Sequence, residues 1–184
     1  MNFLNLLSSK IKAYTVIDLL RLEFEAIFFG FFSLIPTTLG VILRASACKL
    51  LFKKNDGFSW IQPRVTIIHS DRIISGANLA INTGTYINGI GGIIIGKNVL
   101  IGPNVTISSG KHSIVGRFPT VISRPSIPTK IVIRDDVWIG AGAVIMPGVR
   151  LSKGTVVGAN AVVLKSTKPY EVVAGIPSNT LYVR

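Results

Sequence analysis

The sequence of 184 residues predicts a mainly β protein, in which a solenoid of short parallel strands follows an N-terminal helical segment. From about residue 65 onwards, aliphatic residues recur with a period of six, which is typical of a solenoid. The preceding residues are rich in aliphatic and aromatic side chains and lack this period. Glycine and asparagine separate the short apolar stretches of the second part. We therefore divide the chain into residues 1–60 and residues 61–184.

The period of six is clearest in the last third of the chain. Every sixth position there is aliphatic: Ile133, Ile139, Ile145, Leu151, Val157 and Val163. Side chains of a strand alternate with a period of two, so a period of six returns each aliphatic residue to the same face. A helical period of 3.6 would instead spread these residues around the whole surface. The pattern predicts strands stacked coil upon coil around a narrow core, with glycine at the tight corners.

The N-terminal segment contains an uncharged run over residues 26–43, AIFFGFFSLIPTTLGVIL. Its 18 residues are at the lower limit for a membrane-spanning helix. Pro36 lies near the middle of the run and has no backbone N–H to donate. The sequence therefore predicts a helix, a break at residues 33–38 and a second helix.

Basic residues occur on both sides of the apolar run: Lys10, Lys12 and Arg21 before it, and Arg44, Lys49, Lys53 and Lys54 after it. Positive charge at both ends favours a hairpin that lies in the membrane interface over a full crossing. In such a hairpin the basic residues on both flanks, Arg44 included, are expected at the surface beside anionic headgroups. We expect peripheral or monotopic association with the cytoplasmic side of the bacterial inner membrane. The alternative is that the helices cap the solenoid or pack against another subunit, leaving a cytoplasmic protein. The charged residues 18–25 precede the run, which argues against a cleavable signal peptide.

The composition excludes several classes of function. The formal net charge is +12, yet only 15% of the residues are charged, so the excess reflects scarce acids. No basic run is interleaved with aromatic residues, and we expect no nucleic-acid partner. The single Cys48 excludes an intramolecular disulfide and a cysteine-based metal site. His69 and His112 are too few for a three-histidine site in each subunit, and we expect no metal.

Four motifs of the second segment resemble the hexapeptide-repeat acyltransferases, and within them the sugar O-acetyltransferase branch. They are DVWIG at 136–140, IMPGV at 145–149, VGANAVV at 157–163 and VAGIPS at 173–178. The resemblance covers about residues 65–184 and implies a left-handed parallel β-helix, a homotrimer, acetyl-CoA as co-substrate and a sugar or glycan hydroxyl as acceptor. The N-terminal segment resembles only the members that act on envelope polysaccharide precursors, which implies a role in surface polysaccharide biosynthesis.

The repeat is interrupted between Ile107 and Ile133, which are 26 positions apart. Solenoids carry insertions as loops on one face, and such loops often line a binding site. The resemblance places the catalytic histidine at the start of loop 108–130, where His112 stands. A neutral imidazole can accept the proton of a sugar hydroxyl as its oxygen attacks the thioester. Residues 111–130 contain no acid, so a backbone carbonyl or a neighbouring subunit would have to orient His112.

The resemblance also implies residues that bind the acceptor. Asn88, in the sequence Tyr86-Ile87-Asn88, matches an asparagine one coil before the catalytic loop. Its amide offers a sugar both a donor and an acceptor, although asparagine is also a favoured corner residue. Trp138 is expected near the pocket that binds the acceptor, with packing at a trimer contact as its alternative role.

For the co-substrate, the positions that match the family are Ala141, Ala159 and Lys165. Small residues admit the pantetheine arm, and the Ala141 N–H could hydrogen-bond the thioester oxygen as charge develops there. Lys165 could meet the nucleotide phosphates. Small residues are equally what a tight coil corner needs, so a purely structural role stays open for both alanines.

Three interpretations of function follow. The first is an acetyl-CoA-dependent O-acetyltransferase acting on a sugar or glycan precursor, with His112 as general base. The second is N-acetylation of an amino-sugar nucleotide on the same fold. The third is a non-catalytic or metal-dependent β-helix protein, such as one resembling carbonic anhydrase. The scarcity of histidines and the position of His112 argue against the third.

Overall fold

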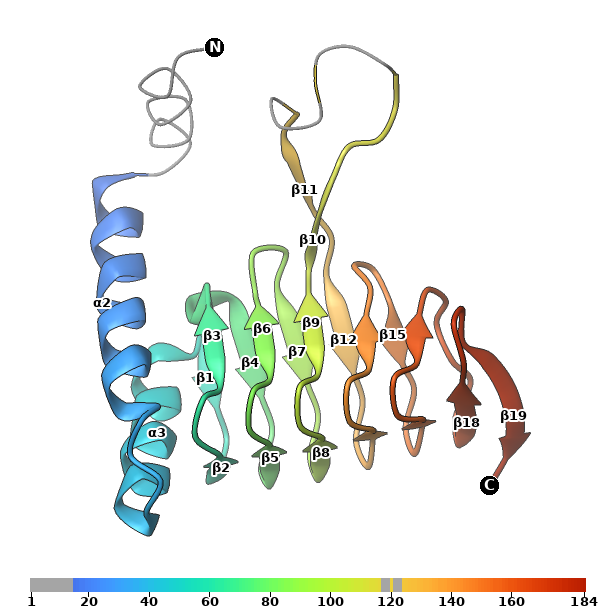
Figure 1. The fold of residues 1–184 in the computed structure, drawn as a ribbon, viewed down its shortest axis with the longest axis horizontal. Coiled ribbons are helices and arrows are strands. Elements are labelled where there is room, and N and C mark those ends of the chain that lie inside the picture. The colour runs from blue at the N-terminus through green and yellow to red at the C-terminus, as the bar shows by residue number, and fades with distance from the viewer. Residues whose placement is uncertain (1–14, 117–119, 121–123) are drawn as a thin grey trace.

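The computed structural model describes residues 15–116, 120 and 124–184, and it shows the predicted succession of helices and solenoid (Figure 1). Two helices stand at one end of the molecule. The strands that follow are stacked along a single axis, and the C-terminus lies at the opposite end.

The helices are α2 (Val16–Phe32) and α3 (Thr38–Leu51), and the residues between them contain Pro36. The predicted break between two helices is therefore confirmed. Thr15 caps α2, because its hydroxyl accepts a hydrogen bond from the Asp18 N–H at 3.1 Å. The Asp18 carboxylate in turn accepts the Thr15 N–H at 3.0 Å, which completes a capping box. This cap fixes where α2 begins.

Arg44 of α3 holds the two helices together and attaches them to the solenoid. Its guanidinium is buried; Nη1 donates to the carbonyls of Phe32 and Ile35 at 2.6 and 2.9 Å. Its Nε donates to the carbonyl of Ile61 at 2.9 Å. The cation thus satisfies one carbonyl in the last turn of α2 and one just after the helix, neither of which has a helical partner. The expectation that Arg44 lies beside lipid headgroups is wrong.

The strands of the solenoid form three sheets, which the chain visits in turn in each coil. Sheet A contains β1 (Lys54–Asn55), β4 (Ile73–Ser75), β7 (Ile93–Ile95), β12 (Ile131–Ile133) and β15 (Arg150–Leu151). Sheet B contains β2 (Ser59–Ile61), β5 (Leu79–Ile81), β8 (Val99–Ile101), β13 (Trp138–Ile139), β16 (Val156–Val157), β18 (Glu171–Ala174) and β19 (Asn179–Val183). Sheet C contains β3 (Thr66–Ile68), β6 (Tyr86–Asn88), β9 (Thr106–Ser108), β14 (Val144–Ile145) and β17 (Val162–Val163). All pairs within these sheets are parallel except β18–β19.

The core is the aliphatic ladder that the period of six predicts. In sheet B, Ile61, Ile81, Ile101 and Ile139 occupy successive rungs of one register. All four are completely buried. Burial of each such side chain contributes about 1.5–3 kcal/mol, so the ladder is a main source of stability. The predicted period and its inward direction are confirmed.

Two corners of the coils matter for the site. The B–C corner is formed by residues 62–64, 82–84, 102–104, 140–142 and 158–160, and the C–A corner by residues 69–72, 89–92, 109–116, 124–130, 146–148 and 164–168. Glycine is needed at the B–C corner because a Cβ on Gly140 would lie 2.7 Å from the Ala159 nitrogen. The neighbouring Asn160 adopts φ of 56°, a left-handed conformation that asparagine tolerates well.

The helical hairpin closes one end of this core. Helix α2 packs on β3 and α3 packs on β2, and Phe29 and Cys48 join the buried cluster. Burial raises the pKa of the Cys48 thiol to about 12, so this side chain acts as a packing residue and not as a thiolate nucleophile. The helices are therefore an integral cap on the first coil, which begins at Lys54.

Candidate active site

The long interruption of the repeat forms a hairpin that projects from the solenoid (Figure 1). Its strands are β10 (Gly110–His112) and β11 (Ser126–Pro128), which pair antiparallel, with His112 opposite Ser126. At the base of the hairpin, the Thr129 N–H donates to the carbonyl of Ser109 at 2.7 Å. His112 is thus held on a paired strand that leaves the C–A corner.

Arg124 stabilises the chain that follows β10, from its own position shortly before β11. Its Nη1 donates to the carbonyl of Ser113 at 3.1 Å, and its Nη2 donates to the carbonyl of Gly116. Both acceptors follow closely after His112 in the sequence. The buried guanidinium therefore restricts the backbone that carries the imidazole.

The imidazole of His112 is exposed. Within the described part of the chain, no hydrogen bond to another residue fixes the ring, and no acid of the hairpin is available to orient it. The group that would select its tautomer therefore stays unassigned, as the sequence indicated. The exposed side chain is therefore open to a substrate hydroxyl.

Asn88 lies at the same corner as the base of the hairpin. Its Oδ1 accepts the Ile90 N–H at 3.0 Å, and its carbonyl accepts the Ser109 hydroxyl at 2.9 Å. The same hydroxyl accepts the Gly91 N–H at 2.8 Å. The Asn88 Nδ2 donates to no other described residue, so it stays available to a ligand while Oδ1 holds the turn. The structural role and the proposed binding role of Asn88 are therefore compatible.

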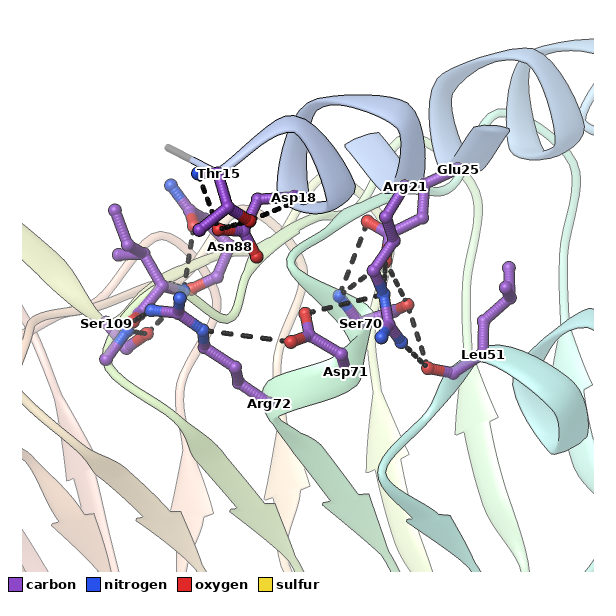
Figure 2. Close-up of polar contacts among 12 residues, drawn as sticks. Thr15, Asp18, Arg21, Glu25, Leu51, Ser70, Asp71, Arg72, Asn88 and Ser109 are labelled. Carbon is purple, nitrogen blue, oxygen red and sulfur yellow. Dashed lines mark hydrogen bonds and ion pairs between the residues drawn. The ribbon is translucent and has the colours of Figure 1, made fainter. Parts of the chain in front are cut away.

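Helix α2 reaches this corner through a buried carboxylate (Figure 2). Figure 2 shows Glu25 pointing from α2 towards Ser70, whose hydroxyl donates to it at 2.5 Å and whose N–H donates at 3.2 Å. Arg21 lies between two acids, with its Nε 3.4 Å from Glu25 and 3.8 Å from Asp71. Arg72 extends the network by donating to the carbonyl of Ile90 at 2.7 Å.

This network contains residues to which the sequence assigned no role. His69 begins the corner turn with φ of 54° and is buried. Desolvation and the nearby Arg72 cation lower the pKa of His69, so its imidazole is neutral at pH 7. The signal that could have identified His69, Ser70, Asp71 and Arg72 is their position, since all four directly follow β3, the sheet C strand of the first coil.

The other predicted site residues occupy different parts of the prism. Lys165 is exposed on the C–A corner, two coils beyond the hairpin. Ala141 and Ala159 stack at the B–C corner. Trp138 lies on the outer face of sheet B, where half of its surface is exposed. One chain therefore brings Asn88 and the hairpin of His112 together, and it does not bring Trp138 or the two alanines to them.

No group of three His, Cys, Asp or Glu side chains in residues 15–116, 120 and 124–184 is placed to hold a metal ion. The functional groups at the C–A corner are the imidazole of His112, the amide of Asn88, the hydroxyls of Ser70 and Ser109, and the guanidinium of Arg72. This set can bind a polyhydroxyl ligand and move one proton.

Two family models match the solenoid. The model described as bacterial transferase hexapeptide (six repeats) matches residues 130–165, and the hexapeptide repeat of succinyl-transferase matches residues 92–110. The two matches lie on either side of the hairpin. They coincide with the coils whose six-residue period is clearest.

Curated relatives extend the similarity along the chain. The galactoside O-acetyltransferase of Escherichia coli K12 is 34% identical over 75% of this chain and 67% of its own length. The putative lipopolysaccharide biosynthesis O-acetyl transferase WbbJ of the same organism is 31% identical over 56% of this chain and 57% of its own length.

A solved structure shows the same architecture. A galactoside acetyltransferase in complex with coenzyme A superposes with a TM-score of 0.82 and 27% identity, over 96% of this chain and 90% of that one. This agreement confirms the left-handed β-helix that the motifs predicted, together with the helices at its N-terminal end. The chain belongs to the hexapeptide-repeat sugar O-acetyltransferases.

Proposed function

We propose that the protein transfers an acetyl group from acetyl-CoA to a hydroxyl of a sugar or glycan, with His112 as the general base. The observation that carries this proposal is the position of His112, exposed on a paired strand at the corner that holds Asn88. The relationship to galactoside O-acetyltransferases supports acetyl-CoA as co-substrate and a sugar as acceptor.

The chemistry needs one proton acceptor. The acceptor oxygen attacks the thioester carbon while its proton passes to the His112 imidazole. The tetrahedral intermediate then collapses, the carbon–sulfur bond breaks, and the imidazolium returns the proton to the leaving thiolate. A thioester is already activated, so the protein needs no covalent intermediate of its own. Asn88 would hold a neighbouring hydroxyl through Nδ2.

An acceptor screen with acetyl-CoA, analysed by mass spectrometry, tests this function. We expect hydroxyl acetylation of at least one sugar, and a loss of about 10²–10⁴-fold in kcat for His112→Ala. Lys111→Ala is the matched control, because it removes the adjacent exposed side chain of β10. If His112→Ala kept more than a tenth of the wild-type kcat, the base would be another group. Transfer to amines alone would support the N-acetyltransferase alternative.

We propose that the active unit is a homotrimer with sites shared between chains. His112 lies on the C–A corner and Ala141 on the B–C corner, so one chain alone does not join these positions. The outer face of sheet B also carries an apolar row along its rungs: Trp60, Ala80, Leu100, Trp138, Val156 and Val172. A contiguous exposed apolar face of this kind is typical of a protein interface. Light scattering that showed a fully active monomer would contradict the trimer.

We also propose that the helical cap binds the cytoplasmic face of the inner membrane and that the acceptor is a precursor of a surface polysaccharide. The similarity to WbbJ supports a polysaccharide precursor as the acceptor. The exposed side of the cap supports membrane binding, because it carries ten large apolar side chains: Val16, Ile17, Leu20, Phe24, Ile27, Phe31, Leu34, Leu39, Ile42 and Leu50. Neither described helix has the length and apolar character that a bilayer crossing requires. These helices would therefore lie in the interface, and the net charge of +12 would favour anionic lipids.

Flotation with phosphatidylethanolamine–phosphatidylglycerol vesicles tests membrane binding. We expect the wild type to float and the double variant Ile27→Ser, Phe31→Ser to stay at the bottom of the gradient. Leu181→Ser is the control, because this residue is similarly exposed on β19, at the other end of the molecule. If the wild type failed to float, the helices would serve only as a cap.

A further inference from the structure

A second feature of the C–A corner is a cavity of about 320 Å³ on the outer side of sheet A. It lies between the first coils and the base of the hairpin, and its walls include Ile90, Gly91 and Pro128. Its volume falls within the range of small-molecule sites. None of the interpretations of the sequence placed a ligand here.

The rim of the cavity is basic. Lys53, Arg72 and Lys130 line it together with a single acid, Asp71. The Asp71 carboxylate lies 3.9 Å from the Arg72 Nε and 3.8 Å from the Nε of Arg21, so it is already engaged by cations. The cavity therefore carries a net positive charge, which favours an anionic ligand.

The three cations differ in how firmly they are held. Arg72 is fixed, because its Nη1 donates to the carbonyl of Ile90 at 2.7 Å. Figure 2 shows its guanidinium extending between Asp71 and the corner that contains Asn88 and Ser109. The ammonium groups of Lys53 and Lys130 have no ion pair or hydrogen bond with any other described residue. Both lysines are exposed and can turn towards a bound anion.

The floor of the cavity is apolar. Ile74 and Ile94 stand side by side in register on the outward side of β4 and β7, and both line the cavity. A ligand that fills it would place carbon-rich surface on these isoleucines and its negative charge at the rim. A sugar phosphate fits this division, since a pyranose ring has apolar C–H faces and the phosphate oxygens are strong acceptors.

The cavity also lies next to Asn88 and the strand that carries His112. Pro128 of its wall pairs with Gly110, two residues before His112 on the same strand. Gly91, on another wall, donates to the Ser109 hydroxyl that is itself bonded to the Asn88 carbonyl. A ligand in the cavity would thus present its hydroxyl groups to the corner where Asn88 and the hairpin meet.

We propose that this cavity binds a phosphate group of the acceptor, so that the substrate is a phosphorylated sugar and not a neutral one. The inference rests on the proposed acetyltransferase function, because it assigns the cavity to the acceptor. The phosphate could belong to a soluble sugar phosphate or to a lipid-linked glycan, and the experiment below distinguishes the two.

The first measurement is independent of turnover. The protein is saturated with coenzyme A, so that the phosphate sites of the co-substrate are filled, and is then titrated with pyrophosphate in a calorimeter. We expect one site per chain and binding at least about tenfold weaker in the double variant Lys53→Gln, Lys130→Gln, since each lysine contributes a charge-assisted contact. Lys97→Gln removes an exposed lysine from a different corner and should bind like the wild type. Equal binding by the double variant, or no binding by the wild type, would overturn the proposal.

The second measurement uses acetyl transfer to galactose, galactose 1-phosphate and galactosyl isoprenyl diphosphate. We expect kcat/KM at least about tenfold higher for a phosphorylated acceptor, a preference that the double variant loses at unchanged KM for acetyl-CoA.

A preference for galactose 1-phosphate indicates a soluble substrate, and a preference for the isoprenyl compound indicates a lipid-linked one. A wild type that used galactose as well as the phosphorylated acceptors, or a double variant that kept the preference, would overturn the inference and leave the acetyltransferase function standing. An increased KM for acetyl-CoA in the double variant would instead assign the cavity to the co-substrate. If pyrophosphate bound as expected but no hydroxyl were acetylated, the proposed function would fail and the anion site would stand.

Discussion

The helical cap and the solenoid use the same apolar residue types in opposite ways. Ile101 of β8 is completely buried, and so are its neighbours along the ladder of sheet B. Ile27 of α2 is 69% exposed, and the other outward residues of the cap resemble it. The solenoid buries its inward aliphatic ladder within one chain, whereas the cap buries one side on the first coil and leaves the other side uncovered. A region whose core is formed by its own repeat is thus joined to a region in which most of the large apolar residues face outwards.

Matched substitutions in the two regions should produce the largest contrast in stability. We expect Ile101→Ala to lower the free energy of unfolding by about 2–5 kcal/mol, because it opens a cavity in a close-packed ladder. Ile27→Ala should change it by no more than about 0.5 kcal/mol in the absence of lipid. Denaturant unfolding of both variants checks this. Equal effects would mean that the exposed side of α2 is covered in solution.

Loss of the contact between the cap and the solenoid should lower the free energy of unfolding by a smaller amount, and mainly near the cap. Glu25→Ala removes the carboxylate that accepts both the hydroxyl and the N–H of Ser70, and we expect a loss of about 1–3 kcal/mol. Hydrogen exchange should accelerate mainly in α2, while the central coils stay protected. Glu23→Ala is the control, because it changes the same residue type on the exposed side of the same helix. General loss of protection in the solenoid would show that the cap is required for the coils to fold.

The smallest predicted effect is a pH dependence of the stability of the first turn of α2. Hydrogen bonds from the Thr15 hydroxyl and N–H lower the pKa of Asp18 below its ordinary value. A lowered carboxyl pKa contributes stability above the unfolded value of about 3.9, and this stability is lost as the pH falls through the folded pKa. We expect fraying of the first turn of α2 below about pH 4. Exchange of these amides measures it, and Asp18→Asn should remove the pH dependence.

Most of the fold could be predicted because it follows from patterns between residues that are close together in the sequence. A six-residue period fixes which side of each strand faces inwards, and Pro36 fixes where the helices separate, since neither depends on distant residues. The contact of Glu25 with Ser70 joins positions 45 apart in the sequence and has no period that reveals it. Arg44 was expected at a surface, and only the packing of α3 on the first coil shows that it is buried.

The candidate site was predictable in part for the same reason. The break in the regular pattern identified the loop, and the resemblance to the family indicated His112 within it; the structure places this residue on a hairpin at the corner of Asn88. The basic cavity was not, because Lys53, Arg72 and Lys130 come from three separate segments that meet only after the coils have stacked. The cofactor positions Ala141 and Ala159 stay predictions, since a small residue at a tight corner is also required by packing.

The central claim is that the base of one chain acts on a co-substrate held by another, and intersubunit complementation tests it directly. His112→Ala removes the base, and Ala141→Trp blocks the predicted path of coenzyme A at a position that is exposed in the single chain. Each variant alone should be inactive. After denaturation and joint refolding at equal amounts, random trimers should recover about a quarter of the wild-type activity, because that fraction of shared sites combines an intact His112 with an intact Ala141. Mixed trimers, verified by native mass spectrometry, that stayed inactive would place both groups in one chain and contradict the account.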